Sequence, residues 1–157
     1  MSGLAGQGPE QVLLPPPAAG DPAVAELNAL VEREFPLLPG HTVRSLRDGV
    51  LSLDAGPGDL MLRPGDTVAG PDQMRVLDLS GYLLLKHLVG LDSSILLRNI
   101  SMSLLRAPAP GTLTSAVSVL SRGTRMAEIR GDLHDESGHL VSTALLTFSF
   151  RKAPDGS

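Results

Sequence analysis

Residues 72–88 read DQMRVLDLSGYLLLKHL, and this stretch decides the fold. Its apolar side chains would cover most of the surface of a helix, with Met74, Leu77, Leu84 and Leu88 along one side and Val76, Leu79, Leu83 and Leu85 around much of the rest. A helix that is apolar nearly all round is usually buried on most sides. Gly70-Pro71 before the stretch and Gly90 after it are typical of helix ends. We therefore expect a long, buried helix.

Four segments with alternating apolar and polar residues follow this helix and predict four strands. They are Ile95–Leu105, Leu113–Ser121, Arg125–Asp135 and Leu140–Phe150. Alternation with a period of two means that one face of each strand is buried. The only large apolar helix available to cover that face is 72–88. The expected fold is therefore α+β, with one antiparallel sheet wrapped around a central helix.

The residues before the central helix predict a second, short helix and a hairpin. Asp21-Pro22 is typical of a helix start, because aspartate caps the first N–H groups and proline suits the first turn. Residues 41–54 read as two strands joined at Asp48-Gly49, a common hairpin dipeptide. Residues 55–69 contain three glycines and two prolines, so we expect a loop there.

The length and composition indicate a single domain from residue 21 to residue 151. Residues 1–20 are rich in glycine, proline and alanine, and we expect a flexible leader there. Residues 152–157 form a short polar tail. No signal peptide and no membrane span are visible in the sequence.

The composition excludes several classes of function. The chain of 157 residues has 13 Lys and Arg against 17 Asp and Glu and only four Phe, Trp and Tyr residues, so we expect no nucleic-acid partner. It contains no cysteine, which removes disulfides and thiolate chemistry and fits a reducing compartment. We therefore expect a cytoplasmic protein, with no metal and no cofactor.

Four short motifs resemble acyl-CoA thioesterases of the phenylacetate-pathway type, which have the hotdog fold. The motifs are RPGDTVAGP at 63–71, VLD at 76–78, SLLRAPAPGTL at 103–113 and SRGTRMAEIRGDLHDESGHLVSTALLTF at 121–148. The resemblance depends on their order and spacing and covers about two-thirds of the chain, from His41 to Phe150. In this fold a second copy normally completes the sheet edge and the cleft, so we expect a homodimer or homotetramer.

Asp78 is the first candidate catalytic residue. It lies among leucines on the predicted central helix, where burial would raise the pKa of its carboxyl group. Such a carboxylate can act as a general base for water or as a nucleophile on a thioester carbon. The resemblance implies the same role, because Asp78 matches the family's catalytic acidic residue. The alternative is a structural pair with Arg75, three residues earlier on the helix.

Gly70 is the second candidate, at the start of the central helix. The first backbone N–H groups of a helix have no partner within it, and they suit the oxyanion of a thioester under attack. Gly70 matches the first glycine of the family's His-Gly-Gly motif, whereas Ala69 and Pro71 stand where histidine and the second glycine would be. Proline has no N–H, so one donor and one polar side chain are absent. The alternative is a plain turn and helix start.

Other polar residues on the helix are weaker candidates. Gln73 is a candidate for positioning water, and Ser80 and Tyr82 are candidate polar neighbours of a cleft. For Asp72 we expect only a favourable interaction with the helix dipole.

The resemblance also places three arginines near the path of coenzyme A. Arg106, Arg122 and Arg125 lie at strand ends, and arginine binds phosphate through a planar fork of donors. The alternative for each is a solvated surface residue. His134 and His139 flank an acidic pair, but a hairpin turn explains that stretch better than a metal site.

The sequence thus favours an acyl-CoA thioesterase-like hydrolase, with acyl-CoA or a similar thioester as substrate. A hydratase is disfavoured, because the Asp-x-Asn-x-x-His signature of hotdog hydratases is missing. Ala69 and Pro71 motivate an alternative, a non-catalytic hotdog protein that binds acyl-CoA or a lipid-like ligand. A purely structural or interaction protein is the third hypothesis.

Overall fold

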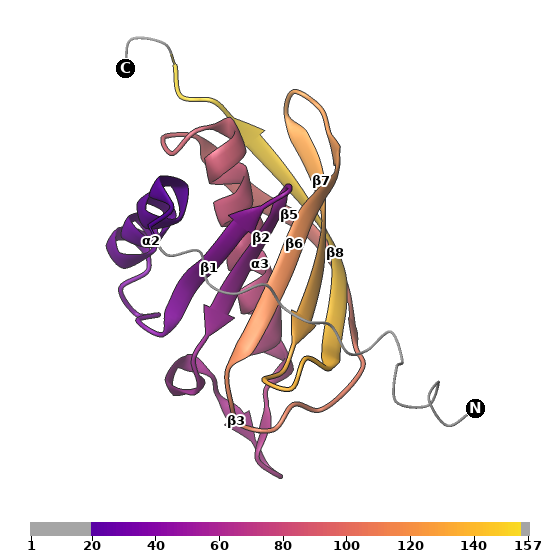
Figure 1. The fold of residues 1–157 in the computed structure, drawn as a ribbon. Helices are drawn as coiled ribbons and strands as arrows, with labels where there is room; N and C mark the ends of the chain where they lie inside the picture. The colour runs from indigo at the N-terminus through magenta and orange to yellow at the C-terminus, as the bar shows by residue number, and fades with distance from the viewer. Residues whose placement is uncertain (1–19, 155–157) are drawn as a thin grey trace, which may run out of the picture.

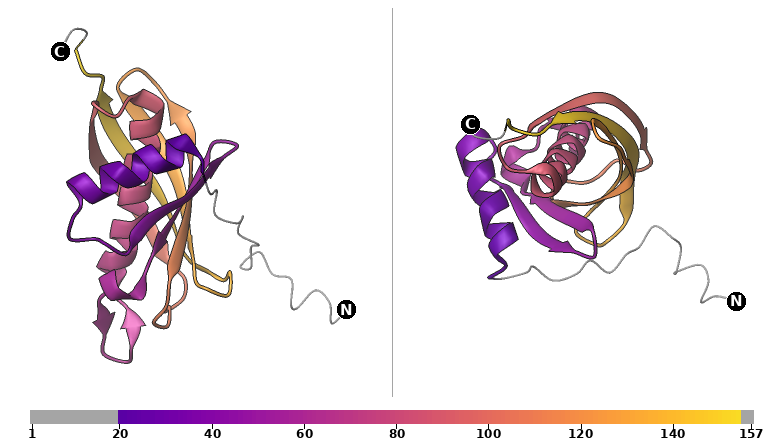
Figure 2. Two further views of the ribbon diagram at one scale, coloured as in Figure 1. Left: turned by 60° about the vertical axis from the view of Figure 1, so that its left-hand side comes forward. Right: turned by 90° about the horizontal axis from the view of Figure 1, so that it is seen from above.

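The computed structural model describes residues 20–154 of the chain. An antiparallel sheet of six strands curls around one long helix, α3 (Gly70–Val89), as Figures 1 and 2 show. The spatial strand order is β1-β2-β6-β7-β8-β5. The strands are β1 (His41–Arg47), β2 (Val50–Ala55), β5 (Ser94–Leu104), β6 (Leu113–Arg122), β7 (Met126–His134) and β8 (Leu140–Arg151). The predicted α+β architecture is confirmed, while residues 1–19 of the predicted leader and 155–157 of the predicted tail lie outside the described residues.

The core lies between α3 and the concave face of the sheet. Leu77, Leu83, Leu84 and Leu85 of the helix are at most 1% exposed, and the predicted inward set of β7 and β8 is buried against them. Gly81 has a specific reason to be glycine, because a Cβ there would lie 2.7 Å from the ring of Phe148. The prediction was wrong for Met74 and Leu88, which lie at the borders of the buried stripe and are 40% and 41% exposed.

Helix α2 (Pro22–Glu34) covers one edge of the sheet (Figure 2). As predicted, it begins after Asp21, whose Oδ1 accepts a 2.9 Å hydrogen bond from the backbone N–H of Ala23. The side chain of Asn28 bonds the backbone of the edge strand β1 twice, accepting from Val43 N–H at 2.7 Å and donating to the Val43 carbonyl at 3.2 Å. Asn28 therefore satisfies main-chain groups of β1 that would otherwise face outward.

The segment predicted as a loop, residues 55–69, contains more structure than expected. After the single turn η1 (Pro57–Asp59), a small hairpin pairs β3 (Leu62–Arg63) with β4 (Thr67–Val68). Strands of two residues are too short to show an alternating pattern, which is why the sequence did not reveal them. The turn between them uses positive φ angles at Gly65 and Asp66, of 94° and 58°.

Strand β5 forms the opposite edge of the sheet. Its 11 residues pair with β8 on one side only, and no other described strand or helix hydrogen-bonds its outer side. Leu96 and Leu104 on this strand are 54% and 56% exposed. The two sheet edges therefore differ, because α2 covers β1 and nothing in the described chain covers β5. No helix in residues 20–154 is long and apolar enough to span a membrane.

Candidate active site

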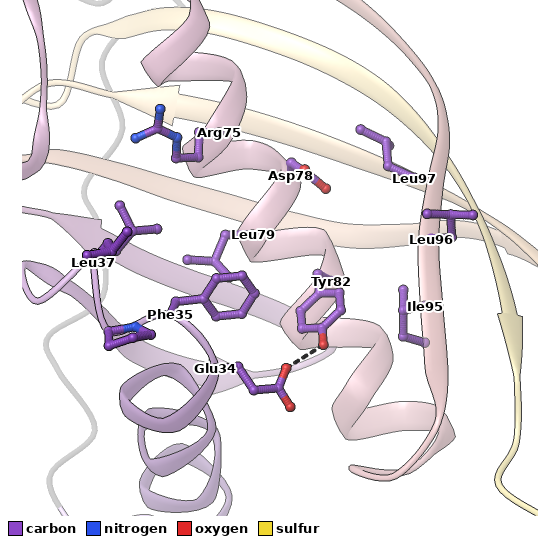
Figure 3. Close-up of a pocket in the computed structure, with 12 residues that line it drawn as sticks. Glu34, Phe35, Leu37, Arg75, Asp78, Leu79, Tyr82, Ile95, Leu96 and Leu97 are labelled. Carbon is purple, nitrogen blue, oxygen red and sulfur yellow. Dashed lines mark hydrogen bonds between the residues drawn. The ribbon is translucent and has the colours of Figure 1, made fainter.

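Asp78 lines a cavity of about 700 Å³ between the C-terminal end of α2, the middle of α3 and the first residues of β5. Most of the wall is apolar. The lining comprises Glu34, Phe35, Pro36, Leu37, Leu38, Arg75, Asp78, Leu79, Tyr82, Ile95, Leu96 and Leu97. Figure 3 shows the Asp78 carboxyl group pointing toward Leu97, while Arg75 extends in the opposite direction.

The Asp78 carboxyl group is half-buried and makes no hydrogen bond or ion pair with another described residue. Burial raises its pKa above the usual value of 3.8, because the charged form loses hydration. The predicted alternative, a pair with Arg75, is not formed. Arg75 instead contacts Asp72, with 3.2 Å between Nη2 and Oδ1. An unpaired carboxylate beside an apolar cavity is available to accept a proton from a bound molecule.

Tyr82 and the end of α2 close the far side of this cavity. The Tyr82 hydroxyl donates a 2.6 Å hydrogen bond to Oε1 of Glu34, and its ring meets Phe35 edge to face, with 5.6 Å between centroids (Figure 3). Burial and the Glu34 carboxylate both raise the pKa of Tyr82, so the phenol stays protonated. Tyr82, a candidate polar neighbour of a cleft, lines this cavity. Its hydroxyl, however, is already used by Glu34.

A second cavity, also of about 700 Å³, lies at the N-terminus of α3. Ala69, Gly70, Pro71 and Gln73 line it, together with the β3–β4 hairpin and the segment after β5. The backbone N–H of Gly70 makes no hydrogen bond with another described residue. Ala69, the residue that caps the helix, provides no side-chain acceptor. The Gly70 N–H is therefore a free donor beside an open space, as an oxyanion site requires.

Gln73 and Asp72 have buried side chains in the first turn of α3. Gln73 Nε2 donates to the Val68 carbonyl at 3.2 Å, but its Oε1 is buried without a hydrogen-bond partner. The residue lines the second cavity, although this oxygen itself is enclosed by the protein. Asp72 does more than complement the helix dipole, since it accepts a hydrogen bond from the Met61 backbone and pairs with Arg75. It thereby holds the β3–β4 hairpin against the helix.

Asp78 and Gly70 line different cavities. They are eight residues apart on one helix, which corresponds to about 12 Å along its axis at 1.5 Å per residue. A carbonyl carbon in contact with Asp78 thus lies too far from the N–H of Gly70 in the same chain to receive its hydrogen bond. The two predicted catalytic residues do not form one site within a single copy of the chain.

The other candidates fall in several places. The prediction that Ser80 lies beside a cleft was wrong. Ser80 is fully buried, and its Oγ makes a 2.6 Å hydrogen bond with Ser115 Oγ inside the core. Arg106 lines the second cavity, whereas Arg122 is exposed and lines none of the cavities described here. Arg125 lines a separate groove on the outer face of the sheet. No three potential metal ligands lie together within the described part of the chain.

Sequence reasoning missed the contribution of α2 to the site. Glu34 and Phe35 were expected only to belong to a helix that packs on the body, yet both line the Asp78 cavity. Neither residue belongs to a motif, and their role depends on where α2 docks. Arg98 and Arg151, which share a groove with Arg125, were missed for the same reason.

Among known proteins, only solved structures are similar to this chain. No protein family model and no curated protein matches the chain. A thioesterase from Haemophilus influenzae superposes with a TM-score of 0.75 at 14% identity, over 94% of this chain and 99% of that one. A proposed thioesterase from a Silicibacter species gives a TM-score of 0.75 at 26% identity, over 82% and 91% of the two chains.

A further structural neighbour is a proposed thioesterase from Ralstonia eutropha JMP134, described as phenylacetic acid degradation-related. It has a TM-score of 0.64 at 26% identity and covers 83% of this chain and 92% of its own. The chain therefore has the hotdog fold, as its sequence predicted, and its structural neighbours are thioesterases of that fold. The resemblance to the phenylacetate-pathway type is confirmed at the level of structural similarity.

Proposed function

We propose that this protein is a hydrolase of acyl-CoA or similar thioesters, with Asp78 as its catalytic acidic residue. The observation that carries the proposal is the unpaired, half-buried Asp78 carboxylate on the central helix, beside an apolar cavity. The thioesterases among the structural neighbours support the same reaction class. The cavity wall formed by Phe35, Leu79 and Leu97 suits an acyl chain.

The chemistry follows from the ionised carboxylate. As a general base, Asp78 takes a proton from water while the water oxygen bonds to the thioester carbon. The resulting oxyanion collapses, the carbon–sulfur bond breaks, and the thiolate leaves and takes up a proton. As a nucleophile, Asp78 would instead form a mixed anhydride, which water then hydrolyses. Both routes yield a carboxylic acid and a thiol.

The oxyanion donor comes from a second copy of the chain in this proposal. Strand β5 has a free edge, and antiparallel pairing of two such edges about their centres would place residues 94–97 of one copy opposite 101–104 of the other. Ile95 and Leu97 line the Asp78 cavity, while Gly70 is adjacent to Leu104, whose Cδ1 lies 3.2 Å from the position of a Gly70 Cβ. Pairing therefore brings Gly70 of the partner subunit toward Asp78.

In this dimer each site combines Asp78 from one copy with Gly70 and Gln73 from the other. Gln73, which lines the second cavity, is the candidate for positioning the attacking water. Arg106 lies near the same entrance, at the second cavity. A homotetramer would contain two such dimers. The cytoplasmic location suggested by the sequence remains a prediction.

A second candidate function is binding of acyl-CoA or a lipid-like ligand without hydrolysis. The first turn of α3 favours it, because Pro71 has no N–H and Ala69 has no polar side chain. Loss of one oxyanion donor costs on the order of a hundredfold in rate. Both functions predict that the protein binds acyl-CoA, but only the first predicts hydrolysis of the thioester.

The test is a panel of acyl-CoA esters of increasing chain length, with release of the thiol as the readout. The proposal predicts turnover by the unmodified protein and its loss in Asp78→Asn, which keeps the size of the side chain but cannot accept the proton. Asp92→Asn, in the turn after α3, is the matched control. Saturable binding of acyl-CoA by calorimetry without turnover of any ester would establish the second candidate. Turnover unchanged in Asp78→Asn would refute the role of Asp78.

A further inference from the structure

Lys86 is a buried cation that lines neither cavity of the proposed site. It lies on α3, one turn after Tyr82, and is 6% exposed. Of the 13 Lys and Arg residues in the chain, only Lys86 and Lys152 are lysines, and Lys152 is exposed just after β8. Burial of a charged group is costly unless its donors find partners, so Lys86 must be well bonded.

The ammonium group of Lys86 contacts two carbonyl oxygens and one aromatic ring. Its Nζ donates to the Ser93 carbonyl at 2.6 Å and to the Leu91 carbonyl at 3.1 Å. It also lies 5.2 Å from the centroid of the Tyr82 ring, within the range of a cation–π interaction. An ammonium group has three N–H donors, and these three partners match that number. Among residues 20–154, no carboxylate pairs with Lys86.

These contacts differ from those of an ordinary lysine at a helix end. Such a lysine bonds the last carbonyls of its own helix. The two acceptors of Lys86 belong instead to the turn after α3, which ends at Val89. The side chain therefore joins three parts of the fold: its own helix, the turn that leads into β5, and the ring of Tyr82.

The Tyr82 ring forms the far side of the Asp78 cavity (Figure 3). Glu34 bonds its hydroxyl and Phe35 meets its ring edge to face, but both residues come from the end of α2. Lys86 contacts the ring from α3 itself. It is thus the contact that fixes the ring relative to the helix that carries Asp78.

The turn after α3 leads directly into another wall of the same cavity. Within the turn, the Ser93 N–H and hydroxyl both donate to the Gly90 carbonyl, at 3.0 and 2.5 Å. Lys86 ties this closed turn to the helix, and β5 begins with the next residue, Ser94. Residues 95–97 of β5 line the cavity. Because β5 is an edge strand with only β8 beside it, the position of its first residues depends on this turn as well.

We infer that Lys86 is a positioning residue that sets the depth of the Asp78 cavity through the Tyr82 ring and the start of β5. The inference rests on the proposed function for its acyl ligand, and it adds the residue that determines which chain lengths the cavity accepts. Without the ammonium group, the ring loses a contact that fixes it and the turn loses two hydrogen bonds. The cavity then deepens, and each further methylene that it buries strengthens binding about fourfold.

The first test observes Tyr82 without any substrate. The chain has one tyrosine and no tryptophan, so the tyrosine band of the near-UV circular dichroism spectrum reports Tyr82 alone. Lys86→Met keeps an unbranched side chain but removes the ammonium group, and it should abolish most of this band. Lys86→Arg keeps a cation and should retain most of the band. Lys152→Met, the same substitution at an exposed lysine, should leave the band unchanged.

The second test measures the accepted chain length by calorimetry. The probes are S-alkyl thioethers of coenzyme A of increasing length, which have no thioester to hydrolyse. For the unmodified protein, Lys86→Arg and Lys152→Met, affinity should stop rising at one limiting length. For Lys86→Met, it should continue to rise about fourfold per methylene beyond that length. In turnover, Lys86→Met should shift the length dependence of kcat/KM in the same direction and leave the acid limb due to Asp78 at the same pH.

The outcomes separate this role from a purely structural one and from the hydrolase. If Lys86→Met is less stable but has an unchanged Tyr82 band and an unchanged limiting length, Lys86 only supports the fold and the inference is overturned. Hydrolysis of thioesters with an unchanged limiting length would also overturn it. A shifted limit in the thioether series with no turnover of any ester would support the inference and count against the hydrolase. Binding of no thioether would overturn both.

One measurement on the unmodified protein applies even if Lys86→Met fails to fold. Burial and hydrogen bonding should slow the exchange of the Lys86 ammonium protons with water, whereas those of the exposed Lys152 should exchange rapidly. NMR of the two lysine side-chain nitrogens distinguishes these rates. Equally rapid exchange at both lysines would overturn the inference, because Lys86 would then hold neither the turn nor the ring.

Discussion

Gly70 and Asp78 occupy one helix, eight residues apart, and each lines a cavity that the other does not. The separation of about 12 Å follows from the helical rise alone, so no side-chain movement removes it. A catalytic unit that needs both residues must therefore take them from two chains. In the proposed dimer the two chains pair at β5, because α2 covers one sheet edge and no described element covers the other.

This arrangement predicts complementation between two inactive variants. Asp78→Asn removes the carboxylate, and Gly70→Pro removes the donor N–H. Proline fits at position 70, because the residue before it, Ala69, already has the extended backbone that proline requires, with ψ of 141°. Each variant alone should lose at least about a hundredfold in kcat. A purified heterodimer of the two, made with different affinity tags, should recover about half of the unmodified activity, because one of its two sites is intact.

Gly70→Ala is the matched control for that experiment, since it adds the same Cβ beside Leu104 but keeps the N–H. It should retain far more activity than Gly70→Pro. A heterodimer no more active than its parents would show that each site lies within one chain. The pairing of β5 with a second copy would then have no part in catalysis.

The environment of Asp78 predicts a pH dependence with a definite sign. Burial raises the pKa of its carboxyl group above 3.8, and only the ionised form accepts a proton. Values of kcat/KM should therefore fall as pH drops through this raised pKa. The other titratable groups on the cavity wall are Arg75, Glu34 and Tyr82. A direct measurement by NMR of the Asp78 carboxyl titration checks the assignment. An acid limb that Asp78→Glu leaves at the same pH would contradict it.

The same raised pKa links the site to stability. A carboxyl whose pKa is higher in the folded state than in the unfolded state releases a proton more readily on unfolding, so it destabilises the fold at neutral pH. Asp78→Asn should consequently raise the free energy of unfolding at pH 7 while it abolishes turnover. Chemical denaturation of both proteins at pH 7 measures the change. A decrease in stability would indicate that the carboxylate holds the fold together instead of serving a substrate.

The sequence predicted the architecture well because periodicity reports burial directly. The inward set of β7, for example, alternates without interruption at Ala127, Ile129 and Leu133, and all three are buried. It predicted the site only in part, because a cavity depends on how distant elements dock. Asp78 could be identified from its apolar neighbours on the helix, whereas Phe35 has no such signal. The bulge at Arg98 shifts the inward positions of β5 from Ile95 and Leu97 to Ile100 and Met102, but Leu96 next to Leu97 obscures this change in the sequence.

His134 predicts a loss of stability in mild acid. It is 3% exposed, its Nδ1 has no hydrogen-bond partner, and burial lowers its pKa below 6.5. The neutral ring is thus favoured in the folded state, and the unfolded chain binds the proton first as pH falls. The contribution of the neutral His134 ring to the free energy of unfolding should be fully present above pH 6.5. It should decline as pH drops from there through the lowered pKa. His134→Gln should flatten this decline in thermal unfolding, whereas His87→Gln, at an exposed position, should leave it unchanged.

The edge-to-face pair of Phe35 and Tyr82 predicts a limit on acyl-chain length. Tyr82 lies one turn beyond Asp78 on α3, about 6 Å along the axis, and Glu34 fixes its hydroxyl. An acyl chain that runs from Asp78 toward α2 therefore meets the two rings after a few carbons. Phe35→Ala should shift the preferred substrate to longer chains, because each further buried methylene contributes about 0.8 kcal/mol. Leu88→Ala, which removes an exposed side chain elsewhere on the helix, is the control. An unchanged ranking of acyl-CoA esters in Phe35→Ala would place the acyl chain outside this cavity.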